Sequence, residues 1–223
     1  MEKTENNAVE ECSFFMKPFR DIHENNLRKR LKHRQFTLIS QNCMGGVIYN
    51  MLGLQSQSPT VNMFIRGESF VRLASNPRKY MQEMEPFPIN EKHEEEGFWP
   101  HPVIGIGDIR LNCLHYDNCQ EAIDSWKRRC ERIDFSRILV MANDWDLNYD
   151  EALIKGILEL PCPKVLFSTR VKDKDDIVYC TEKVWTKRGR SINMPVLTEY
   201  KYGYKRCFEY IFDVVDWINS SLG

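Results

Sequence analysis

Short apolar runs alternate along this chain with segments whose apolar residues recur at helical spacing. The runs at residues 36–40, 138–142 and 164–168 are rich in aliphatic side chains, as is typical of buried strands. Residues 118–133 and 149–160 place apolar side chains three and four positions apart, which predicts amphipathic helices. We therefore expect an α/β fold in three layers, α/β/α, with a mixed and mostly parallel sheet that helices cover on both faces.

Other segments predict the elements that surround this sheet. Residues 102–116 alternate with a period of two, which predicts a β-hairpin whose second strand ends at His115. The stretch before it, residues 86–102, is rich in proline and glutamate, and we expect an exposed connection. Residues 177–180 indicate an edge strand, and residues 199–222 have the spacing of one C-terminal helix.

The length of the chain sets the domain organisation that we expect. A chain of 223 residues suits a single hydrophobic core, so residues 19–223 are expected to form one α/β domain. The first residues are polar and acidic, and we expect residues 1–18 to be disordered or extended. A basic amphipathic helix is predicted over residues 19–34. No apolar run reaches the roughly 18 to 20 residues of a membrane span, so none is expected.

The balance of charges and the spacing of the cysteines limit the kinds of partner and metal that we expect. The 31 Lys and Arg residues are balanced by 32 Asp and Glu, so we expect no general attraction for nucleic acid. Eight cysteines are scattered singly, without a Cys-x-x-Cys pair or neighbouring histidines, which favours reduced thiols over a zinc site. We expect a cytoplasmic protein with no resident metal or other cofactor.

Three polar segments follow predicted strands and are the first candidates for chemistry, because strand ends in open α/β sheets converge on a crevice. Cys43 opens a predicted helix, where unpaired N–H groups and the helix dipole favour a thiolate. His115 could take the thiol proton as general base, and Asp144 or Asn143 could orient the imidazole. The pattern indicates a Cys-His-Asp triad for nucleophilic catalysis.

Residues near these strand ends are candidates for substrate binding. Gly45 and Gly46 would let helix N–H groups approach the oxyanion of a tetrahedral intermediate. Tyr116 offers a ring on which a sugar could stack. Arg128 and Arg129 could clamp a phosphate or carboxylate, although such clusters also form surface ion pairs.

Two alternatives of other kinds remain open. Asp144 and Asp146, at a spacing of two after an apolar strand, could hold a divalent metal bridging a sugar-nucleotide diphosphate, as in many glycosyltransferases. Asp146 would then bind the activated sugar. Alternatively, Cys43 is simply packed, as free cysteines often are, and the protein is a non-catalytic carbohydrate-binding or scaffold subunit.

The element Asn42-Cys43-Met44-Gly45-Gly46 carries a resemblance to a family, together with the surrounding segment 36–65 and positions as far as residue 169. The sequence resembles an uncharacterised bacterial family commonly labelled exopolysaccharide biosynthesis proteins, although Met44 stands where that family usually has an aromatic residue. A looser likeness links Asn42-Cys43, Ser58-Pro59, His115 and Arg128-Arg129 to papain-like thiol enzymes, which include acyltransferases. The resemblance adds Asn42 to the substrate-binding candidates.

The expected function is therefore a transferase of exopolysaccharide or other surface-carbohydrate biosynthesis. Cys43 would be the nucleophile, His115 the base and Asp144 its orienter. The expected partners are a carbohydrate or activated-sugar substrate and a carrier-bound acyl donor.

Overall fold

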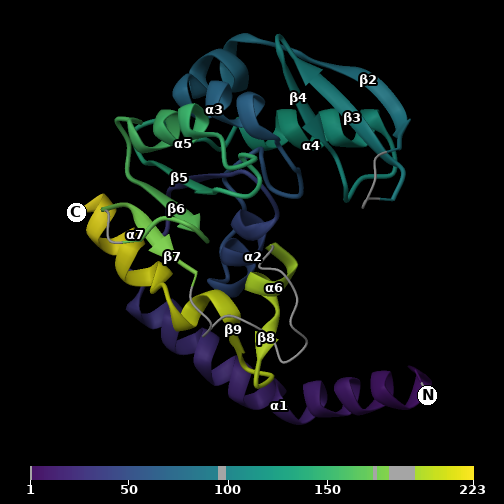
Figure 1. Cartoon of the computed structure of the whole chain (residues 1–223), viewed down its shortest axis with the longest axis vertical. Helices are drawn as coiled ribbons and strands as arrows, with labels where there is room; N and C mark the ends of the chain where they lie inside the picture. The colour runs from purple at the N-terminus through teal and green to yellow at the C-terminus, as the bar shows by residue number, and fades with distance from the viewer. Residues whose placement is uncertain (1, 95–98, 173–174, 181–193) are drawn as a thin grey trace.

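Four parallel strands form the centre of the molecule (Figure 1). The computed structural model describes residues 2–94, 99–172, 175–180 and 194–223. The strands are hydrogen-bonded in the order β1-β5-β6-β7, all parallel, and they are β1 (Thr37–Ser40), β5 (Ile138–Asn143), β6 (Lys164–Ser168) and β7 (Ile177–Tyr179). The apolar runs predicted all four, and β7 has the expected edge position.

A second, antiparallel sheet is formed by β2 (Pro86–His93), β3 (His101–Ile106) and β4 (Ile109–Asn112). The prediction that residues 86–102 are only an exposed connection is wrong in part, because β2 pairs with β3. β2 is an edge strand with mostly exposed side chains, a position in which proline is tolerated. β4 ends before the expected boundary at His115, so this histidine lies in a turn. The hairpin thus belongs to its own sheet instead of the parallel one.

Helices precede and connect these strands. The chain begins with α1 (Glu2–Arg30), which includes the basic helix expected over residues 19–34 as far as Arg30. The helices that lie between β1 and β6 are α2 (Met44–Met51), α3 (Gly67–Ser75), the π-helical turn η1 (Lys79–Glu83), α4 (Cys119–Cys130) and α5 (Glu151–Leu158). Asn118 caps α4, since its side chain accepts the N–H of Glu121.

The C-terminal part is broken into several short elements, so the prediction of one helix over residues 199–222 is wrong. They are α6 (Met194–Thr198), β8 (Tyr200–Lys201), β9 (Lys205–Arg206), the 3₁₀ helix η3 (Cys207–Tyr210) and α7 (Val214–Leu222). Tyr202 and Gly203 adopt positive φ angles of 57° and 80°, which turn the chain between β8 and β9. Asp213 caps α7. Helical spacing was therefore a correct signal only for the last segment.

The two faces of the parallel sheet pack into separate hydrophobic clusters. On β5, Val140 and Ala142 join one cluster while Leu139 and Met141 join the other, because successive side chains of a strand point to opposite faces. The first cluster includes residues of α3, α4, α5 and the antiparallel sheet, and the second includes residues of α1, α2 and α7. Figure 1 shows these groups on either side of the central strands. The α/β class is confirmed.

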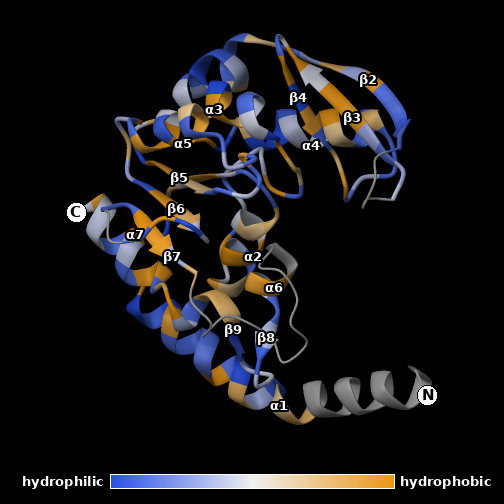
Figure 2. Ribbon diagram, in the orientation of Figure 1, coloured by the Kyte–Doolittle hydropathy of each residue, from blue (hydrophilic) through white to orange (hydrophobic). Residues whose placement is uncertain are grey.

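Apolar residues concentrate on β3, β4 and the parallel strands, whereas much of α1 is hydrophilic (Figure 2). Among the described residues, no helix combines the length and the apolar character that a membrane crossing requires. The boundary expected at residue 18 and the single domain expected from 19 to 223 stay predictions.

Candidate functional site

Cys43 is the residue at which β1 passes into α2. β1 ends at Ser40, and α2 begins at Met44 with Cys43 as its N-cap residue. Gly45 lies against the strand, since a Cβ added to it would be 2.8 Å from Ser40 Cβ. Only glycine allows an approach this close. The contact between the first turn of α2 and the end of β1 therefore fixes where the thiol lies.

The thiol of Cys43 meets the imidazole of His115. Cys43 Sγ lies 3.2 Å from His115 Nε2, although the two residues are 72 positions apart in the chain. His115 stands on the turn after β4 and is exposed, whereas Cys43 is half-buried. The structure thus brings together two of the three residues expected to carry chemistry, at a distance that allows proton transfer.

The resting state of Cys43 differs from the expectation drawn from its helix position. Burial raises the pKa of the Cys43 thiol; the Cys43 backbone N–H lowers this pKa and the charge of Asp146 raises it, with a net increase. The helix N-terminus alone had predicted a lowered pKa. Because burial disfavours the charged form more strongly, Cys43 rests as a thiol and needs a base to ionise.

Asp146 is the carboxylate that belongs to this site. Its Oδ2 accepts hydrogen bonds from Asn42 Nδ2 (2.8 Å) and Asn143 Nδ2 (2.7 Å), and its backbone N–H donates to Asn143 Oδ1. Asn42 Oδ1 in turn accepts the N–H of Met44, in the first turn of α2. This network connects the end of β5 to the helix that carries Cys43, so it holds the thiol in place.

The same burial affects Asp146 itself. Burial raises its pKa, against the lowering effects of the Asn143 and Asn42 hydrogen bonds and of the positive charge of Arg66. Arg66 is the N-cap residue of α3 and had not been singled out from the sequence. Its side chain makes no cap hydrogen bond, and no motif in the sequence marked it.

The expected role of Asp144 is corrected by its partners. Its Oδ2 accepts hydrogen bonds from Ser168 Oγ (2.6 Å) and Thr169 N (3.1 Å), so it faces β6 and the loop that follows. Asp146 faces the loop after β1 instead. In the described part of the chain no carboxylate is hydrogen-bonded to His115, which makes the pair with Cys43 a dyad.

These contacts also bear on the metal-dependent alternative. The carboxylates of Asp144 and Asp146 have separate hydrogen-bond partners on different sides of the strand end. Across the described ranges, no three His, Cys, Asp or Glu side chains are grouped so that they could hold a metal ion.

The remaining substrate-binding candidates have structural partners. Arg129 Nη1 donates to the Val61 carbonyl (2.8 Å) and to Tyr116 Oη (2.5 Å), and Tyr116 Oη donates to the same carbonyl (3.4 Å). Arg128 Nη2 donates to Ser125 Oγ on its own helix. A Cβ on Gly46 would lie 3.1 Å from Val61 Cγ1. These residues tie α2 and α4 to the segment around Val61.

Trp99 is a neighbour of the dyad that sequence reasoning missed. Its ring lies 6.3 Å from that of His115, at 66° between the planes. It lies within the proline- and glutamate-rich stretch, residues 86–102, for which the sequence predicts an exposed connection. Its only signal was the pair Phe98-Trp99 after a run of glutamates, and exposed apolar residues are common enough on protein surfaces that this pair indicated no site.

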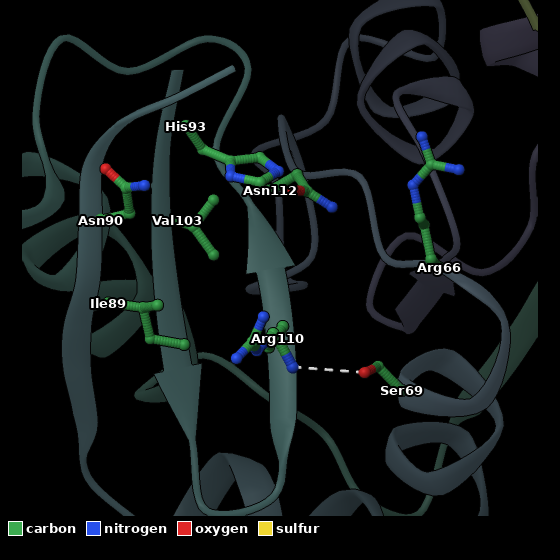
Figure 3. A pocket seen from close by; sticks show the side chains of 8 residues that line it. All are labelled: Arg66, Ser69, Ile89, Asn90, His93, Val103, Arg110 and Asn112. Atoms are coloured by element: carbon green, nitrogen blue, oxygen red, sulfur yellow. Dashed lines mark hydrogen bonds between the residues drawn. The ribbon is translucent and has the colours of Figure 1, made fainter. Parts of the chain in front are cut away.

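A pocket of about 420 Å³ lies between the outer face of the antiparallel sheet and the start of α3 (Figure 3). Its wall includes the cationic side chains Arg66 and Arg110 and the imidazole of His93, and is completed by Ser69, Ile89, Asn90, Val103 and Asn112. Figure 3 shows the N–H of Arg110 bonded to Ser69 across the gap. The N–H of Gly67, next to Arg66 in the chain, donates to the Asp146 carbonyl (3.3 Å), so this cationic pocket and the thiol site meet at the start of α3.

Comparison with known proteins gives a family and a distant relative. A sequence model described as "Domain of unknown function (DUF1919)" matches residues 15–219. An "Uncharacterized protein" of Haemophilus influenzae is similar, with 29% identity over 120 residues, which are 54% of this chain and 55% of that protein. The chain spans about half the length of the curated relative that it matches.

Proposed function

Because the chain belongs to the DUF1919 family, whose description names no activity, we propose a function from the site itself: Cys43 and His115 transfer an acyl group through a thioester. The observation that carries the proposal is the 3.2 Å between Cys43 Sγ and His115 Nε2. An imidazole at this distance can take the proton of a neutral, half-buried thiol when substrate binds, and the sulfur then becomes a nucleophile.

The proposed reaction has two halves that return the enzyme to its starting state. His115 Nε2 takes the proton from Cys43 Sγ, and the sulfur attacks the acyl carbonyl carbon of the donor. The bond to the leaving group breaks as that group takes the proton from His115, and a thioester remains on Cys43. An acceptor hydroxyl then loses its proton to His115 and attacks the thioester; the released sulfur recovers the proton.

Backbone N–H groups in the first turn of α2 are the proposed donors to the oxyanion. The first N–H groups of an α-helix have no carbonyl partner within the helix, and they point toward its N-terminus. The N–H of Met44 is taken by Asn42 Oδ1, so this donor is engaged. The N–H groups of Gly45 and Gly46 follow in the same turn, and we propose that they point to the position where negative charge would develop, together with the Cys43 N–H that faces its own sulfur at rest.

The cationic pocket supports a carrier-bound acyl donor. Carrier arms and activated acyl groups commonly hold phosphate, which arginine binds well. Arg66 and Arg110 line this pocket beside the thiol site.

Support for a carbohydrate acceptor in surface-polysaccharide assembly comes from the resemblance of segment 36–65 to exopolysaccharide biosynthesis proteins. We also propose a cytoplasmic location, since seven described cysteines are free thiols, as a reducing compartment keeps them.

Trapping of the acyl-enzyme tests this function. The protein is incubated with a small acyl thioester such as acetyl-N-acetylcysteamine, quenched in acid and digested, and acylated peptides are identified by mass spectrometry. The acyl group is expected on Cys43, and His115→Ala should slow acylation by about 10²-fold or more. Cys162→Ala removes another half-buried thiol and should leave the rate unchanged. Absence of acyl-Cys43, or equal rates with and without His115, refutes the proposal.

A further inference from the structure

Trp99 is held in a fixed position while remaining exposed. Its indole Nε1 donates to the Leu114 carbonyl (3.0 Å), and its own carbonyl accepts from His101 Nδ1 (2.8 Å). His101 is buried, with 2% exposure, whereas Trp99 is 58% exposed. Two hydrogen bonds thus fix an aromatic ring that presents a flat apolar face to solvent beside His115. Such a ring is a preorganised binding surface.

A groove of about 700 Å³ runs along this ring and reaches His115. Its apolar lining comes from Trp99 and from Pro100, Pro102 and Leu114, with part of Tyr116. The end of β2 and the turn after β4 supply the other residues. A ligand lying against the indole would therefore have one end next to the imidazole of the dyad.

The charges of the groove limit the kind of ligand it can take. Glu91, Glu94 and Asp117 line it together with a single cation, Lys92. Glu91 Oε2 accepts the N–H of Cys119, so its carboxylate is partly engaged. The excess of carboxylates repels anions, and their oxygens accept hydrogen bonds from hydroxyl groups. An uncharged ligand rich in hydroxyls fits this lining, whereas a phosphorylated one fits the cationic pocket.

We propose that this groove binds an uncharged saccharide, with the apolar face of a sugar ring stacked on Trp99 and its hydroxyls bonded to Glu94 and Asp117. Its role as the acceptor site rests on the proposed function, because His115 would take the proton of the saccharide hydroxyl that attacks the thioester. Binding itself requires no catalysis. The donor and the acceptor then approach the dyad from two differently charged sides.

Saccharide binding is tested on full-length Cys43→Ala protein, so that no turnover interferes. Lactose, cellobiose, maltose and N,N′-diacetylchitobiose are titrated separately against ¹⁵N-labelled protein while the indole N–H signals are followed by NMR. At least one of these uncharged disaccharides is expected to bind saturably and to shift the Trp99 signal. Calorimetry with the same sugar should show at least tenfold weaker binding for Trp99→Ala and substantial rescue by Trp99→Phe.

Tyr202→Ala is the matched control, since Tyr202 is an exposed aromatic residue on the turn between β8 and β9. It should bind the sugar as the parent does. The proposal is overturned if none of the four sugars binds, if Trp99→Ala binds equally well, or if glucose 1-phosphate binds this groove more tightly than the uncharged sugars. Acylation of Cys43 without saccharide binding would refute the saccharide site and leave the proposed acyl transfer intact. Saccharide binding without acylation of Cys43 would support the saccharide site and refute the proposed acyl transfer.

Discussion

The side chains around Cys43 divide into one that contacts the thiol and several that hold it in place. His115 makes the contact, while Asn42, Asn143 and Asp146 hold the first turn of α2 against the end of β5. The charge of Asp146 also contributes to the raised pKa of Cys43. One carboxylate therefore positions the nucleophile and adds to the effect of burial, which is the main cause of the raised thiol pKa.

Replacing Asp146 by asparagine separates these two effects. The amide oxygen can still accept from Asn42 and Asn143, but the negative charge is gone. Since that charge raises the pKa of the Cys43 thiol, its loss should increase the thiolate fraction at every pH below full ionisation. The pH midpoint of Cys43 alkylation, followed by peptide mass spectrometry, should move down by up to about one pH unit.

Asp124→Asn, which alters an exposed carboxylate on α4, is the control for this shift and should leave the midpoint in place. An unchanged or higher midpoint in Asp146→Asn would mean that the carboxylate does not act on the thiol.

At the scale of elements, the position of the site depends on the close contact of α2 with β1. Gly45→Ala would bring its new Cβ to 2.8 Å from Ser40 Cβ, and backbone would have to move to relieve the clash. We expect a loss of about 1–3 kcal/mol in the free energy of unfolding, measured by urea denaturation.

The double variant Ser40→Gly/Gly45→Ala tests the cause of that loss. Removing the Cβ of Ser40 removes the atom that the new methyl group meets, so part of the stability should return relative to the sum of the single variants. Strict additivity of the two substitutions would show that the clash is not the source of the cost.

Strands that are buried were predictable from their apolar sequences. Elements that depend on pairing with a distant strand, or on where the chain turns, were not. The runs around Leu38 and Val140 are buried on both faces and therefore apolar throughout, which identified their strands. β2 is exposed along the edge of its sheet, so its composition resembled that of a loop. The apolar spacing around Phe208 matched a helix, but the turn at Gly203 and the break before Asp213 divide that segment.

The candidate site was predictable in the same uneven way. Strand ends converge in a parallel sheet, which predicted Cys43 and the residues after β5 at one edge. His115 was placed there too, as a strand end of the same sheet, but it reaches Cys43 from a turn after β4 of the antiparallel sheet, and the order of elements does not predict that contact. Which of Asp144 and Asp146 faces Cys43 depends on how the chain turns after β5, and spacing does not determine that. Trp99 could not be assigned because its hydrogen bond to Leu114 joins residues of separate turns.

At the scale of the whole molecule, β1 supports both hydrophobic clusters. Leu38 belongs to the cluster with α1, α2 and α7, and its neighbour Ile39 to the cluster with α3, α4 and α5; both are fully buried. If residues 19–223 form one domain, Leu38→Ala and Ile39→Ala should each lower the midpoint of the same cooperative urea transition, with a loss of about 2–5 kcal/mol in the free energy of unfolding. Two transitions, each sensitive to only one substitution, would instead indicate two folding units.

The most direct measurement is the rate at which each cysteine of the native protein is alkylated by iodoacetamide near neutral pH, with and without His115. Cys43 has a raised pKa and so depends on the imidazole to lose its proton. We predict that His115→Ala slows alkylation of Cys43 at least about tenfold, while Cys130 and Cys162, which are also half-buried, react as before. Equal Cys43 rates in the two proteins would contradict it.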